Sequence, residues 1–111
     1  MHIKYLRNAF LGYAFLACGA VNVHADEGRE LYLNYQCWQC HGYEGQGGAA
    51  PRIASTPYPF AAFAEFLRRP NVMPAYPPNL LDDAELRLIY DYVISIPAPP
   101  RLDEIPELNG D

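Results

Sequence analysis

The chain has 111 residues, room for one small domain, and a chain this short buries only a modest share of its surface when it folds. Its formal net charge of −5 argues against nucleic-acid binding, which depends on basic patches. Eleven prolines and eight glycines predict long loops between few regular elements. Side-chain packing alone would then give a small core, so we expect something further to stabilise the fold.

Residues 1–25 have the pattern of a cleaved Sec-type signal peptide. Lys4 and Arg7 supply the positive start, and residues 9–21 form an apolar stretch without charge. Small residues precede the expected cleavage site after Ala25. The apolar stretch is thirteen residues long, short of the ~20 that a membrane-spanning helix needs. We therefore expect an exported, periplasmic protein that begins at Asp26.

A second interpretation of this segment makes Cys18 a lipidated residue, which would anchor the protein to the membrane. Phe15 and Leu16 fit the usual residues before such a cysteine poorly. With cleavage after Ala25, the mature chain keeps one histidine, one methionine and two cysteines. It also has six arginines against thirteen acidic residues, a net charge of −7.

Residues 26–36 should form the first helix. Asp26 and Glu27 suit its first turn because the helix dipole favours negative charge there. Leu31, Tyr32 and Tyr35 then form an apolar strip that should face the core.

The next five residues are Cys37-Trp38-Gln39-Cys40-His41. This C-x-x-C-H order is the signature of covalent c-type haem attachment, in which two thiols on one helical turn add to the two vinyl groups of one haem. The adjacent His41 would bind the iron. A thioredoxin-like redox pair would need a βαβ context, and a zinc site would need two further ligands. The motif therefore predicts one haem c, held by Cys37, Cys40 and His41.

Residues 42–58 lose helical periodicity and contain four closely spaced glycines followed by Pro51. Such a loop lets the backbone lie close to a ligand, and no phosphate-binding Lys-Ser/Thr pair follows it. Two interpretations of Arg52 stay open: it contacts a haem propionate, or it faces solvent.

Residues 59–69 predict a short helix with Pro59 at its first position. Its aromatic stripe, most simply core, consists of Phe60, Phe63, Phe66 and Leu67. A proline-stiffened loop at 71–78 then presents Met73, the single methionine of the mature chain. A lone methionine is ordinarily core filler, but a haem protein also needs a sixth iron ligand.

The last strong helix should begin at Asp82, where Glu85 three residues later completes a capping box. It should end near Ser95, before Pro97. Its apolar stripe consists of Leu86, Ile89, Tyr90 and Val93.

Residues 97–111 form a proline-rich acidic tail that contains Leu102, Ile105 and Leu108. Two interpretations stay open for it. Either it is a solvated end, or its apolar residues lie along a groove on its own domain or on a permanent partner.

Residues 26–96 resemble a single-haem class I cytochrome c: a helix, the Cys37-to-His41 motif, a glycine and proline loop, a middle helix, Met73 and a last helix. The resemblance implies an all-α fold of about three to four helices packed around one covalently bound haem, with the first and last helices crossing. It also implies that His41 and Met73 are the two axial ligands of the iron.

Finer contacts also follow from the resemblance. Gly28 and Tyr32 on the first helix would face Tyr90 on the last. The Pro51 carbonyl would accept a hydrogen bond from the ring of His41 and fix its orientation.

A six-coordinate iron passes single electrons, and the sequence offers no separate catalytic constellation. We therefore expect an electron carrier, not an enzyme. It would work freely or as the haem subunit of a dehydrogenase or oxidase, with a dehydrogenase as donor and an oxidase or another cytochrome as acceptor. The alternative is a haem-based gas sensor with an open distal site. A weaker one is a haem-free structural or metal-binding module.

Overall fold

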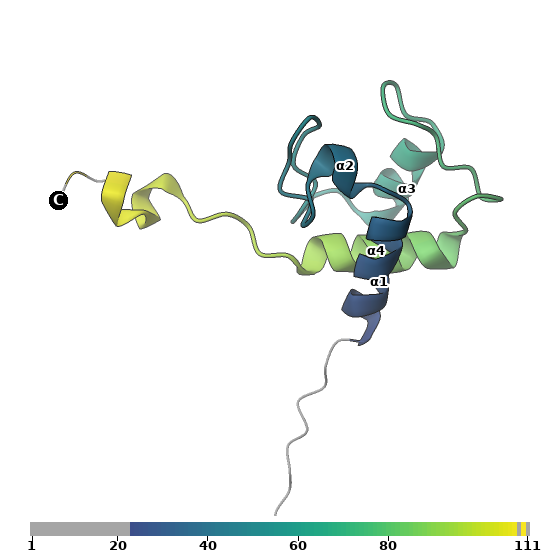
Figure 1. Ribbon diagram of the computed structural model, residues 1–111, viewed down its shortest axis with the longest axis horizontal. Helices are drawn as coiled ribbons and strands as arrows, with labels where there is room; N and C mark the ends of the chain where they lie inside the picture. The colour runs from purple at the N-terminus through teal and green to yellow at the C-terminus, as the bar shows by residue number, and fades with distance from the viewer. Residues whose placement is uncertain (1–22, 109, 111) are drawn as a thin grey trace, which may run out of the picture.

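The computed structural model describes residues 23–108 and residue 110. Within these residues it contains four α-helices, two short 3-10 turns and no strand, which confirms the all-α prediction (Figure 1). The elements are α1 (Val23–Asn34), α2 (Trp38–His41), α3 (Phe60–Arg68), α4 (Asp83–Ser95), η1 (Leu102–Glu104) and η2 (Pro106–Leu108). Most of the predicted signal peptide, including Cys18, lies outside the described residues. No helix within the described part is long and apolar enough to cross a membrane.

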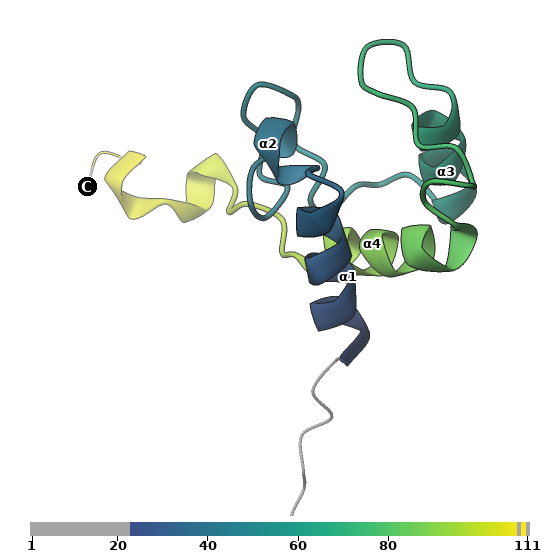
Figure 2. The same ribbon diagram turned by 45° about the vertical axis from the view of Figure 1, so that its right-hand side comes forward.

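The helices α1 and α4 cross closely, as Figures 1 and 2 both show. The crossing point is Gly28, which has no side chain to hold the helices apart. A Cβ atom at this position would lie 2.1 Å from the Leu88 carbonyl oxygen and 2.8 Å from Tyr92 Cβ. Close contact at Gly28 therefore sets the angle and register of the two helices.

The register of this crossing differs from the expected one, in which Gly28 and Tyr32 would face Tyr90. Tyr92, not Tyr90, packs against Tyr32, with their ring centroids 5.5 Å apart. Leu88 and Tyr92 are four residues apart and share one face of α4, whereas Tyr90 lies on another face. Tyr90 instead packs on Phe60 and Phe63 of α3, so the predicted contact with α1 is wrong.

Replacing Gly28 by alanine should therefore destabilise the fold. The added methyl group overlaps main-chain atoms that cannot move aside, and such overpacking costs about 3 kcal/mol of the free energy of unfolding. Urea unfolding of the haem-loaded protein, followed by circular dichroism, measures the loss. Glu30→Ala is the matched control, because Glu30 is exposed on the same helix. Equal stability of the two variants would contradict the close crossing.

The end of α1 leads directly into the cysteine motif. Gln36 adopts a left-handed backbone conformation with φ of +61°, and its N–H bonds to the Leu33 carbonyl while that of Cys37 bonds to the Tyr32 carbonyl. These two bonds form a Schellman cap, which closes a helix with one left-handed residue. The chain turns at Gln36, and α2 starts immediately after Cys37.

The capping box of α4 is confirmed. The Asp82 carboxylate accepts from the Glu85 backbone N–H at 2.8 Å, and Glu85 accepts in return from the Asp82 N–H. The helix ends at Ser95, and Ile96 is extended as a residue before proline should be. One buried cluster joins α1, α3 and α4: Tyr32, Phe63, Leu67, Leu81, Leu86, Ile89, Tyr92 and Val93.

Candidate haem-binding site

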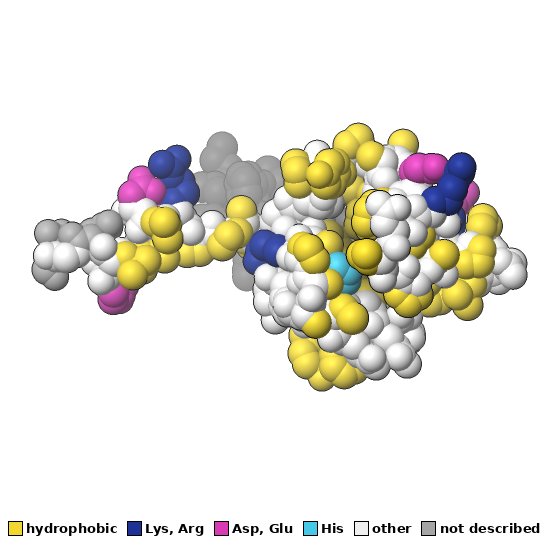
Figure 3. Space-filling model, turned by 90° about the horizontal axis from the view of Figure 1, so that it is seen from above, with side chains coloured by type: hydrophobic (Ala, Val, Ile, Leu, Met, Phe, Trp, Pro, Cys, Tyr) yellow, Lys and Arg dark blue, Asp and Glu magenta, His cyan; other side chains and the backbone are white. Residues whose placement is uncertain are grey.

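A cavity of about 620 Å³ opens between α2, α3 and the loops that follow them. The four residues predicted to hold haem all line it: Cys37, Cys40, His41 and Met73. The remaining lining residues are mostly apolar or aromatic: Tyr32, Ala50, Pro51, Arg52, Ile53, Thr56, Tyr58, Ala62, Phe63, Phe66, Leu67, Val72, Pro74, Tyr76 and Ile89. Apolar side chains also predominate on the face drawn in Figure 3, with charged ones toward its edges.

One helical turn carries both cysteines to this cavity. The backbone N–H of His41 bonds to the Cys37 carbonyl at 3.0 Å, so the motif forms a single turn from Cys37 onward. Both cysteines are free thiols, with Cys37 half-buried and Cys40 exposed. Burial raises the pKa of the Cys37 thiol to about 11. A reactive redox cysteine has a lowered pKa, so the raised pKa of Cys37 does not favour a thioredoxin-like pair.

The glycine loop folds back onto this turn. The backbone N–H of Gly47 bonds to the His41 carbonyl at 2.8 Å, and that of Ala50 bonds to the Cys40 carbonyl at 2.9 Å. Gly42, with φ of +82°, makes the reversal that permits this return. The following residue, Pro51, is thereby placed beside the ring of His41.

The ring of His41 is oriented by that proline, as the resemblance implied. Its Nδ1 lies 2.8 Å from the Pro51 carbonyl oxygen. Because a carbonyl only accepts, Nδ1 must carry the hydrogen, and Nε2 is left as the nitrogen able to bind a metal ion. A ligand held in this way has its orientation and tautomer fixed before it meets the iron.

The loop that carries Met73 is held by Arg68, a residue that sequence reasoning missed. The Arg68 guanidinium donates to the carbonyls of Tyr76 and Leu81 and to the Asp83 carboxylate, at 2.7 Å for Leu81. Its side chain is only 14% exposed. The loop is thus pinned at its far end and at the start of α4, and Met73 is half-buried at the cavity. The only feature of the sequence that could have pointed to Arg68 is its position as a basic residue in the last turn of α3.

Two tyrosines form the inner wall of the cavity. Tyr32 is fully buried and donates its hydroxyl to the Gly42 carbonyl at 2.6 Å, and desolvation raises its pKa. Tyr76 donates to the Tyr35 carbonyl at 3.0 Å and packs edge-on against the Tyr35 ring. Both hydroxyls join the cavity wall to the main chain around the motif. Packing is therefore their role, as the sequence indicated for Tyr32.

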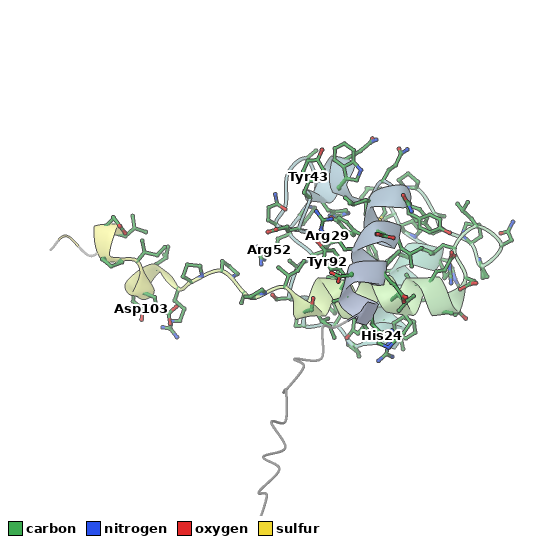
Figure 4. All side chains as sticks on the ribbon, turned by 60° about the horizontal axis from the view of Figure 1, so that its bottom comes forward. His24, Arg29, Tyr43, Arg52, Tyr92 and Asp103 are labelled. Atoms are coloured by element: carbon green, nitrogen blue, oxygen red, sulfur yellow. The ribbon has the colours of Figure 1, made fainter. Side chains whose placement is uncertain are left out.

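Phe66 and Arg52 lie at the edge of the cavity. Phe66 was expected in the core but is 52% exposed and lines the opening. The Arg52 guanidinium donates to the carbonyls of Ala54, at 3.2 Å, and Pro97, at 2.9 Å. The Arg52 side chain therefore binds main-chain carbonyls beside the cavity. Figure 4 shows Arg52 at the margin of the domain.

Residues 23–93 match the family model described as cytochrome c oxidase, cbb3-type, subunit III. The chain belongs to this family. It is therefore a c-type cytochrome, which confirms the predicted haem c and the resemblance to class I cytochromes c. In the same comparisons neither a curated protein nor a solved structure matches the chain.

The residues of this cytochrome fit a haem. Two thiols on one turn can form the two thioethers, His41 has a free Nε2, and an apolar cavity lies beside them. Haem bound here supplies reversible one-electron chemistry at its iron, so the domain transfers electrons. The chain's own part is to exclude water with the aromatic wall and to hold the ligands. No cluster of three or more metal-ligating side chains occurs in the described part of the chain.

Proposed function

We propose that this cytochrome carries single electrons between redox proteins outside the cytoplasm, with His41 and Met73 as the two axial ligands of its iron. The observation that carries the proposal is that His41 and Met73 line one cavity although 31 positions separate them in sequence. Each is held by hydrogen bonds of its own, His41 by Pro51 and the Met73 loop by Arg68.

Two axial ligands from the protein decide which chemistry is possible. Methionine and histidine together leave no open position for a gas or a substrate, and they raise the reduction potential. A gas sensor would instead need Met73 to stay away from the iron. The pinned loop at 70–81 supports ligation, because a ligand on a fixed loop loses little conformational freedom on binding.

A reductive titration without oxygen tests the carrier function. We expect one electron per haem and the same midpoint potential in the reducing and oxidising directions, because the ligand set need not change between the two states. Myoglobin, whose haem has an open distal position, serves as the comparison for carbon monoxide binding. Rapid binding of carbon monoxide by the reduced wild type would favour the gas-sensor function instead.

Export is part of the proposal, because the first 25 residues have the pattern of a signal peptide. The mature protein should therefore begin at Asp26. Its intact mass is expected to equal residues 26–111 plus one haem, measured by mass spectrometry on protein from the native host. A mass that starts at a lipidated Cys18 would make it a membrane-anchored cytochrome.

We propose a dehydrogenase as electron donor and an oxidase or another cytochrome as acceptor. The family description, which names a subunit of a cbb3-type oxidase, supports an oxidase as the acceptor. The charge of −7 on the mature chain would steer it toward a basic patch. The rate of association should therefore fall as salt rises and screens the field.

A further inference from the structure

The tail that follows α4 begins at the edge of the haem-binding cavity. Arg52, which lines the cavity, donates to the Pro97 carbonyl at 2.9 Å. Ser55, a few residues along the same loop, bonds through its N–H to the Val93 carbonyl at 2.9 Å and through its hydroxyl to the Ile96 carbonyl. The loop that lines the cavity thus fixes the point where the tail leaves the domain.

A stiff spacer follows this fixed point. Residues 97–100 contain three prolines and adopt no helix or strand. Such a segment tends to be extended, at ~3.1 Å per residue, and resists folding back on itself. Figures 1 and 2 both show the tail leading away from the helices. The spacer therefore holds the last part of the tail away from the domain, on the side where Arg52 lies (Figure 4).

The last part of the tail combines exposed apolar and acidic side chains. Leu102 is 74% exposed and Leu108 is 62% exposed, whereas Ile105, which lies between them in the sequence, is half-buried. They recur every three residues: Leu102 begins the turn η1, Leu108 ends the turn η2, and Ile105 lies between the two turns in an extended conformation. Acidic residues intervene, namely Asp103, Glu104 and Glu107. A merely solvated tail would carry few such large aliphatic residues.

We propose that residues 102–108 are a docking segment that binds an apolar groove with a basic rim on the cytochrome's redox partner. The inference rests on the proposed electron-carrier function. Leu102, Ile105 and Leu108 would enter the groove, and the acidic residues would meet the rim. This segment lies beyond the residues 23–93 that match the family model.

Charge favours a redox partner as the binding surface for this segment over three alternatives. A membrane surface with anionic lipids would repel the acidic tail. A second copy carries the same excess of acidic residues, and residues 26–96 of the chain's own domain have nine acidic residues against five arginines, so either would repel it as well. Because the tail leaves beside the cavity, docking would hold the cavity near the partner and raise its effective concentration there.

The test uses the full-length haem-loaded protein with the double substitution Leu102→Ser/Leu108→Ser. Ile94→Ser is the matched control, because Ile94 is 44% exposed on α4 and outside the tail. In a second experiment, the photo-reactive residue p-benzoylphenylalanine replaces Leu102, and crosslinks are mapped in extracts of the native host. Electron exchange is then measured between each variant and the crosslinked protein after its purification.

We expect the photo-reactive residue to crosslink to a redox protein, at a site flanked by arginine or lysine. The double variant should exchange electrons with that protein at least about tenfold more slowly at low concentration, whereas Ile94→Ser should not. Reduction by dithionite should be equal in all variants. A crosslink to residues 23–96 of the same chain, to a second copy or to nothing would overturn the docking segment, as would equal exchange rates. A wild type that dithionite does not reduce would instead overturn the electron-carrier function.

Discussion

Replacing both Cys37 and Cys40 by alanine is expected to abolish covalent attachment of haem. Both thiols line the cavity and stand on one turn next to His41, and each can form one thioether. Either single variant should keep one bond and accumulate less haem-loaded protein. Denatured wild type should keep its haem after extraction with acidified acetone, whereas the double variant should release all of it.

The control for this experiment is Gln39→Ala, which changes an exposed residue of the same turn. It should retain its haem as fully as the wild type, because Gln39 supplies no thiol and does not line the cavity. Haem that is completely extracted from the wild type would contradict thioether attachment. Haem that resists extraction from the double variant would show that other residues carry the bond.

Replacing Met73 by alanine is expected to open the distal side of the iron. Met73 is the single methionine of residues 2–111, so no other thioether can take its place. Loss of a methionine ligand should lower the reduction potential by on the order of 0.1 V, part of the ~0.8 V range that axial ligands span. The reduced variant should also bind carbon monoxide readily, which rapid mixing measures.

Val72→Ala provides the control for Met73. Val72 precedes it on the same loop, lines the same cavity and is 95% exposed. Its replacement should leave the potential and the slow reaction with carbon monoxide unchanged. A Met73→Ala protein that keeps the wild-type potential would contradict axial ligation by Met73.

The parts of the fold with short-range signals could be predicted from the sequence. The capping box at Asp82 and Glu85 lies within four residues, and Pro97 forbids the helix beyond Ser95. The motif from Cys37 to His41 likewise lies within one helical turn. In such places the chemistry of neighbouring residues decides the structure, and the predicted bounds of α3 and α4 hold to within one residue. The first helix, predicted at 26–36, instead begins three residues earlier and ends two residues earlier, at Val23–Asn34.

Contacts between distant elements could not be predicted in the same way. Periodicity placed Tyr90 on the core stripe, but the close approach at Gly28 determines which face of α4 meets α1, and Tyr92 takes that place. Arg68 donates mainly to backbone carbonyls, which every residue has, so its partners cannot be identified from the residue types in the sequence. Both features depend on how the helices pack, and the pattern along the chain does not contain that information.

The optical spectrum of the wild-type protein tests the central claim, ligation of one haem by His41 and Met73, most directly. We predict a sharp α-band in the reduced protein, a weak near-infrared band from methionine bound to ferric iron in the oxidised protein, and little change when carbon monoxide is added. A broad high-spin spectrum without the near-infrared band, converted at once by carbon monoxide, would contradict the account.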